Sequence, residues 1–175
     1  AKQRKKLRVR PACEFAPEAA EYLVEPYLPR GMITILGGVS GSGKTSLALD
    51  TCARISRGEG SRPVLYLTAE NDPNKVLRPR AEAMGADLTR LYFQDGASYA
   101  MGDEELAALC RSLRPALIVF DPIQSYLGQG VQMNRAEQVR PLLDALGALA
   151  KELDMAVVLI SHMSKPGPGV SSALD

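Results

Sequence analysis

The stretch Met32-Ile33-Thr34-Ile35-Leu36 followed by Gly38-Val39-Ser40-Gly41-Ser42-Gly43-Lys44-Thr45 decides the fold. The first five residues are an apolar run typical of a buried strand, and Ser46-Leu47-Ala48-Leu49 begins a helical pattern. Glycines between a strand and a helix N-terminus let backbone N–H groups turn toward an anion. The pattern G-x-x-x-x-G-K-T therefore predicts a phosphate-binding loop.

This loop predicts the binding of a nucleoside triphosphate. The residues expected to contact the phosphates are Gly38, Ser40, Gly41, Ser42, Gly43, Lys44, Thr45 and Ser46. We expect the Lys44 ammonium to reach the β- and γ-phosphates and the Thr45 hydroxyl to ligate Mg²⁺. The alternative is a glycine- and serine-rich turn with an exposed lysine.

Length and composition are those of one globular domain. A chain of 175 residues with 46% apolar residues is large enough to bury a core. No apolar run approaches the roughly 20 residues that span a bilayer, so we expect no membrane partner. Cys13, Cys52 and Cys110 are scattered and lack metal-ligand spacing. Reduced thiols of this kind favour a cytoplasmic protein.

The start of the chain is strongly basic. Six of its 21 basic residues lie in the first ten positions, so the remainder is mildly acidic. We expect residues 1–12 to form a disordered basic arm and residues 13–175 to form the folded core. Such an arm either follows a nucleic-acid backbone or is a solvated tail.

Strand and helix patterns alternate after residue 31. Apolar runs predict strands at 32–36, 64–67, 91–93, 116–120 and 156–160. Helices are expected at 44–56, 73–84, 103–112 and 135–153, with Asp72 capping the second and Gly85 closing it. This order predicts an α/β fold, a mostly parallel sheet with helices on both faces. After Lys165 the composition is that of a loop, and we expect the domain to continue with further strands.

Two carboxylates follow strands at the predicted carboxyl edge, where ligands bind in such sheets. Leu117-Ile118-Val119-Phe120-Asp121 has the Walker B pattern, in which Asp121 holds the Mg²⁺ shell, mostly through water. A turn cap before Pro122 is the alternative for Asp121. Glu70 is the predicted general base for the attacking water, and Asp72 competes for that role but suits a helix N-cap better.

Two more polar residues follow the last predicted strand. His162 is the only histidine, and its position at a strand end predicts a sensor of the γ-phosphate or its water rather than a structural residue. Lys165 either reaches a neighbouring subunit's nucleotide or a DNA phosphate, or is a solvated loop charge.

Together these motifs resemble the RecA-type ATPases, and most closely the plasmid- and phage-type RepA-like replicative helicases. Besides the phosphate loop, the resemblance rests on the runs Leu67-Thr68-Ala69-Glu70-Asn71-Asp72, Leu77-Arg78-Pro79-Arg80-Ala81-Glu82-Ala83, Phe120-Asp121-Pro122, Tyr126-Leu127-Gly128, Asn134-Arg135-Ala136 and Ser161-His162-Met163-Ser164-Lys165. It covers residues 27–165. It implies a RecA-like P-loop NTPase core, ATP with Mg²⁺, a ring-shaped or filamentous homo-oligomer and action on single-stranded DNA. It also implies that Glu70 is the catalytic glutamate, Asp121 the Walker B acid and His162 the γ-phosphate sensor.

The resemblance also implies a strand order. In RecA-type domains the strand after Walker B lies between that strand and the phosphate-loop strand. Strand 156–160 is then central, with His162 between Lys44 and Asp121, and residues 128–134 and 163–172 are the DNA-facing loops. Neither loop contains an aromatic residue that stacks on bases. Arg78 and Arg80 either approach the adenine or a subunit interface, or are helix-surface charges.

Three functions agree with these motifs. We favour an ATP-driven, helicase-type motor of DNA replication. The alternative is a non-motor ATP-binding switch in DNA recombination or regulation. A small-molecule phosphotransferase is the third, although the sequence shows neither the arginine-rich lid nor the acceptor pocket that such kinases usually need.

Overall fold

The computed structural model describes residues 8–58, 62–96 and 99–162. Two predicted features fall outside these ranges: the DNA-facing loop at 163–172, which includes Lys165, and residues 1–7 of the basic arm. In the described part of the chain no helix is both long and apolar enough to cross a membrane.

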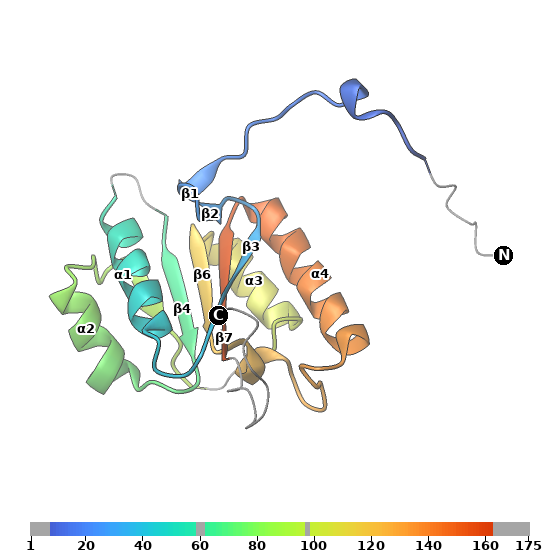
Figure 1. The fold of residues 1–175 in the computed structure, drawn as a ribbon. Helices are drawn as coiled ribbons and strands as arrows, with labels where there is room; N and C mark the ends of the chain where they lie inside the picture. The colour runs from blue at the N-terminus through green and yellow to red at the C-terminus, as the bar shows by residue number, and fades with distance from the viewer. Residues whose placement is uncertain (1–7, 59–61, 97–98, 163–175) are drawn as a thin grey trace, which may run out of the picture.

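Five parallel strands form the central sheet, in the order β3-β7-β6-β4-β5 (Figure 1). Their bounds are β3 (Ile33–Gly38), β4 (Val64–Thr68), β5 (Leu91–Phe93), β6 (Leu117–Asp121) and β7 (Ala156–His162). Because β7 pairs with β3 on one side and β6 on the other, the predicted central position of this strand is confirmed. The α/β, RecA-like fold expected from the sequence is confirmed with it.

Helices cover both faces of the sheet (Figure 1). The bounds are α1 (Lys44–Arg57), α2 (Arg78–Ala83), α3 (Glu104–Leu113) and α4 (Ala136–Leu153). Alternate residues of the strands divide the core in two. Tyr66 and Val119 pack in the cluster that includes residues of α1 and α2, whereas Leu65 and Ile118 pack in the cluster that includes residues of α3 and α4.

Two parts of the fold differ from the sequence-based expectation. The first is a small antiparallel hairpin before the sheet, formed by β1 (Tyr22–Val24) and β2 (Leu28–Pro29). Its turn is closed by a hydrogen bond from Tyr27 N to Val24 O of 2.8 Å. Short 3-10 helices lie at Ala12–Glu14 and Ile123–Tyr126.

The second difference is the start of the helix predicted at 73–84. Pro73–Leu77 forms a π-helix that leads into α2, and Leu77 N donates to Asp72 O at 3.2 Å. Pro79 explains the wider turn, because it has no N–H for the carbonyl four residues earlier and its ring crowds that carbonyl. The predicted cap is present: the Asp72 carboxylate accepts hydrogen bonds from Asn74 N and Lys75 N, both at 2.8 Å.

Candidate nucleotide-binding site

The loop from β3 to α1 has the backbone conformation that its sequence requires. Gly41 and Gly43 have φ angles of 80° and 83°, in the left-handed region that side-chain-bearing residues rarely adopt. Gly43 is the N-cap of α1, so the loop meets the helix N-terminus directly. Ser40 and Ser42 are exposed in the loop, and Ser46 is exposed in the first turn of the helix.

Lys44 is folded back over this loop. Its side chain is buried, with the residue only 6% exposed, and Nζ donates to Gly38 O at 2.9 Å and to Val39 O at 2.7 Å. A Cβ atom at Gly38 would lie 3.0 Å from Ser42 Oγ and 3.6 Å from Lys44 Cδ. A side chain at position 38 would therefore crowd the Ser42 hydroxyl, while its distance from the Lys44 stem would be an ordinary contact.

A buried carboxylate joins α1 to the sheet. Thr45 Oγ1 donates to Asp121 Oδ2 at 2.9 Å, and Tyr66 OH donates to the same oxygen at 2.7 Å. Asp121 is fully buried, and its Oδ1 has no hydrogen-bond partner among the described residues. Burial, and then the charge and hydrogen bond of Asp121, raise the pKa of Tyr66 far above its ordinary value. The phenol therefore keeps its proton and acts as a donor.

These oxygens fit Mg²⁺. The Thr45 hydroxyl uses its proton on Asp121 and keeps its lone pairs for a metal. Asp121 Oδ1 is a buried carboxylate oxygen without a donor in the described part of the chain, and Mg²⁺ is held in proteins by such oxygens and by water. A buried polar atom left unpaired calls for a bound partner, and a hydrated cation provides one.

Glu70 and His162 meet at the same edge of the sheet. His162 is paired with Gly38 in the β3–β7 register, and its Nε2 lies 3.5 Å from Glu70 Oε2. Neither ring nitrogen of His162 has a hydrogen-bond partner within the described ranges, although both are shielded from solvent. Glu70 follows a turn in which Glu70 N and Asn71 N donate to Thr68 Oγ1 at 3.3 and 3.2 Å.

The structure thus brings together predicted site residues that lie far apart in the sequence, between Gly38 and His162. Lys44 and Thr45 come from the loop and α1, Glu70 follows β4, and Asp121 and His162 end β6 and β7. Their catalytic, phosphate-binding and metal-binding roles stay predictions.

Tyr66 is a site residue that the sequence analysis missed. A tyrosine within a strand of valine and leucine is expected to be a core aromatic, and Tyr66 does pack edge-to-face on Phe93. The signal that could have identified it is the period of two in β4, which places Tyr66 on the same face as Thr68. Thr68 is in turn the register partner of Asp121.

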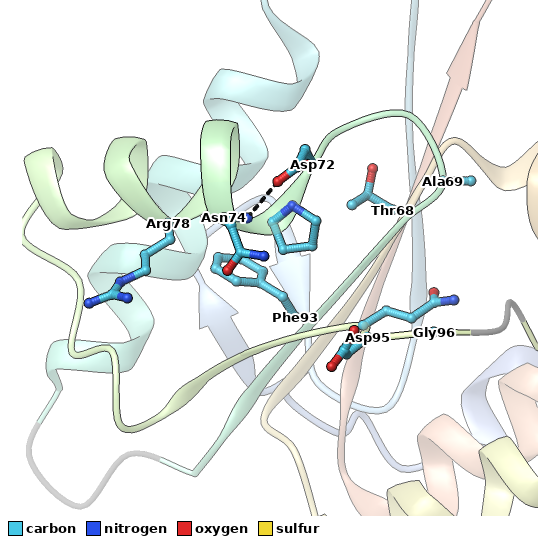
Figure 2. A pocket seen from close by; sticks show the side chains of 10 residues that line it. Thr68, Ala69, Asp72, Asn74, Arg78, Phe93, Asp95 and Gly96 are labelled. Carbon is cyan, nitrogen blue, oxygen red and sulfur yellow. Dashed lines mark hydrogen bonds between the residues drawn. The ribbon is translucent and has the colours of Figure 1, made fainter.

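A polar pocket of about 500 Å³ lies beside this site, at the carboxyl ends of β4 and β5. Figure 2 shows Thr68 and Ala69 at the end of β4, Asp72 and Asn74 on the helical side, and Asp95 and Gly96 opposite them. Arg78 also lines the pocket. Arg78 and Arg80 are both exposed, and both alternatives given for them from the sequence stay predictions.

A phosphate-loop geometry, a buried strand-end aspartate and this strand order together define a RecA-type P-loop ATPase. The profile of the family described as "AAA domain" matches residues 3–168, and the chain belongs to this family.

Curated relatives agree with this class. The chain is 27% identical over 141 residues to the DNA repair protein RadA of Mycobacterium tuberculosis (strain CDC 1551 / Oshkosh), a match of 78% of this chain and 28% of the relative. It is 28% identical over 139 residues to the same-named protein of Escherichia coli (strain K12), with coverages of 78% and 28%. For Mycolicibacterium smegmatis the identity is 30% over 149 residues, with coverages of 80% and 30%.

The chain therefore spans less than a third of the length of these relatives. They bear the name RadA, so the resemblance to the RepA-like helicase branch stays a prediction.

Proposed function

We propose that this chain is the Mg²⁺-dependent, ATP-hydrolysing core of a protein that acts on single-stranded DNA. It works as a helicase-type motor and assembles into a homo-oligomeric ring or filament. The observation that carries the proposal is the cluster at the carboxyl edge. It combines a buried lysine on a phosphate loop, a threonine–aspartate pair with one unpaired carboxylate oxygen, and a glutamate in contact with a histidine.

Each residue of the cluster has a separate role in the proposed phosphoryl transfer. Bound Mg²⁺ supplies neutralisation of the negative charge that develops on the phosphates. Loop N–H groups and the Lys44 ammonium hold the β- and γ-phosphates, while Thr45 and Asp121 hold the metal shell. Glu70 orients the attacking water and accepts its proton. His162 contacts the γ-phosphate or this water, and its contact with Glu70 links hydrolysis to the end of β7.

Action on DNA is supported by the relatives, which are named DNA repair proteins. Within this chain, residues 128–134 follow β6 on the same edge as the candidate site, and Gly128 and Gly130 there have φ angles of 90° and 77°. A loop bent by two such glycines can approach a nucleic-acid backbone closely. Association into a ring or filament rests on the resemblance to RecA-type ATPases.

The test is ATP hydrolysis with and without single-stranded DNA, by the 175-residue chain and by its Glu70→Gln variant. We expect DNA to stimulate the wild-type rate and the variant to lose turnover while still binding ATP. Glu82→Gln is the matched control, because Glu82 is exposed on α2. A Glu70→Gln rate equal to wild type removes Glu70 from the role of base. A rate indifferent to DNA contradicts the DNA part of the proposal.

A non-motor switch is the second candidate. The relatives are named DNA repair proteins, which favours this candidate over a replicative role. Strand separation distinguishes the two: a motor releases the labelled strand of a forked duplex with ATP, whereas a switch binds DNA with ATP and releases none.

A further inference from the structure

We propose that Tyr66 is a positioning residue for the metal-binding carboxylate: its hydroxyl fixes Asp121 so that one carboxylate oxygen stays available to the magnesium shell. The inference rests on the proposed function, because it assigns a role to a residue behind the metal ligands. It adds strand β4 to the predicted metal-binding pair of Thr45 and Asp121, which lie on α1 and β6.

The hydrogen bond between Tyr66 and Asp121 is short and buried. Tyr66 is fully buried, and its OH donates to Asp121 Oδ2 at 2.7 Å. That oxygen also accepts from Thr45 Oγ1 at 2.9 Å. Two donors on one oxygen restrict rotation of the carboxylate and leave Oδ1 without a donor among the residues described. The hydrogen bonds thus hold Oδ2 in place and leave Oδ1 available to a metal.

The strand register explains why a tyrosine can do this from β4. Tyr66 pairs with Val119, and Thr68 pairs with Asp121, so Asp121 lies two residues further along the neighbouring strand. Both Tyr66 and Val119 belong to the core on the α1 side. A phenol is long enough to reach diagonally to Asp121 on the neighbouring strand. Thr68 lies directly opposite Asp121, but its Oγ1 accepts from Glu70 N and Asn71 N.

Packing alone does not require the hydroxyl. The ring of Tyr66 already packs against Phe93, with centroids 6.3 Å apart, and phenylalanine would keep this contact. A buried hydroxyl is costly unless it is hydrogen-bonded, and this one is bonded to the residue that holds the metal shell. Groups behind metal ligands typically change metal affinity by about 10- to 100-fold when they are removed.

The test compares Tyr66→Phe with Tyr126→Phe in the 175-residue chain. Tyr126 is an equally buried tyrosine, but its OH donates to Gln94 Oε1 at 2.9 Å. The measurement is Mn²⁺ affinity of the ADP complex, followed by electron paramagnetic resonance, together with ADP affinity without metal. We expect Tyr66→Phe to weaken Mn²⁺ binding about tenfold and to leave metal-free ADP binding unchanged. Tyr126→Phe should change neither affinity.

Equal Mn²⁺ affinity in Tyr66→Phe and wild type overturns this inference and leaves the proposed function standing. A wild-type chain that binds no Mn²⁺ with ADP overturns both. Should Tyr66→Phe fail to fold, 3-fluorotyrosine at position 66 keeps the ring and the hydroxyl and reports through its ¹⁹F resonance. That resonance should shift when Mg²⁺ is added to the ADP complex, and it should shift more than one at position 126, where the hydroxyl donates to Gln94 and not to Asp121. An unshifted resonance at position 66 also overturns the inference.

Discussion

The two edges of the central sheet, at the amino ends and at the carboxyl ends of its strands, differ in whether their buried polar groups are hydrogen-bonded. At the amino edge, the Arg62 guanidinium donates to four backbone carbonyls, those of Arg114, Pro115, Leu153 and Asp154, at 2.7 to 3.1 Å. At the carboxyl edge, Asp121 Oδ1 and both nitrogens of His162 are shielded from solvent and have no hydrogen-bond partner in the ranges that the structure describes, although His162 Nε2 lies 3.5 Å from Glu70 Oε2. Buried polar groups normally have hydrogen-bond partners, so we expect a ligand to supply them at the carboxyl edge, whereas Arg62 already supplies them at the amino edge.

Arg62 also contacts the two non-glycine residues with positive φ angles in the described part of the chain. Arg114 and Asp154 end α3 and α4 with φ angles of 49° and 50°, which non-glycine residues rarely adopt. Both carbonyls accept from Arg62, and the Arg62 side chain also lies 3.7 Å from Asp154 Oδ2. One side chain therefore caps two helix C-termini, and strain at this edge is compensated locally.

The largest effect is expected from Lys44→Ala at the carboxyl edge. Loss of the ammonium removes a preorganised charge from the phosphates, and ATP turnover should fall about 100-fold or more. Steady-state phosphate release measures this change. Lys75→Ala is the control, because Lys75 is exposed. A Lys44→Ala chain with wild-type turnover would place hydrolysis elsewhere in the molecule.

Arg62→Ala should test the opposite edge, with an effect on stability and none on chemistry. It leaves four carbonyls and two helix ends without their donor, so the free energy of unfolding should fall by about 2–3 kcal/mol. Urea denaturation followed by circular dichroism measures it. Arg62→Lys should recover only part of the loss, since an ammonium lacks the planar fork. A lower ATP turnover per folded molecule would break the division between the edges.

His162→Ala should have a smaller effect at the carboxyl edge. If the unpaired nitrogens serve the γ-phosphate or its water, their removal costs one hydrogen bond and lowers kcat about tenfold. Stopped-flow phosphate release measures kcat, and His162→Gln should retain part of it by keeping a donor. Stability that falls while kcat stays constant would make His162 a structural residue.

Asp72→Ala separates a cap from a catalyst. Asp72 accepts from two backbone N–H groups, so its removal should lower the free energy of unfolding by about 1 kcal/mol. Asp72→Asn should restore most of that stability, because the amide oxygen still accepts. Turnover per folded molecule should be that of wild type for both variants. A large loss of turnover in Asp72→Asn would transfer the role of base from Glu70 to Asp72.

The sheet was predictable because its strands are continuous apolar runs, as in residues 117–120, and the phosphate loop because glycines mark it. The hairpin at Tyr22–Pro29 was not predicted, because Pro26 and Pro29 are typical of segments that break structure and β2 has only two residues. The π-helix at Pro73–Leu77 was not predicted either, because the residues around Pro79 have an ordinary helical pattern.

In the site, each predicted residue lies near a strand end, in the loop or in the first turn of α1, where position alone indicates a role. Tyr66 lies in mid-strand and Arg62 just before β4, so their partners depend on register and on the packing of helix ends. Local sequence carries neither kind of information.

The hydrogen bonds of Lys44 to the carbonyls of Gly38 and Val39 have a thermodynamic consequence. The ammonium already donates to two backbone carbonyls. A polyphosphate that replaces them would gain only the difference in free energy between its own hydrogen bonds to Lys44 and those two. We therefore expect this ammonium to favour strongly charged anions, because a weakly charged anion competes less well with two peptide oxygens for the same cation.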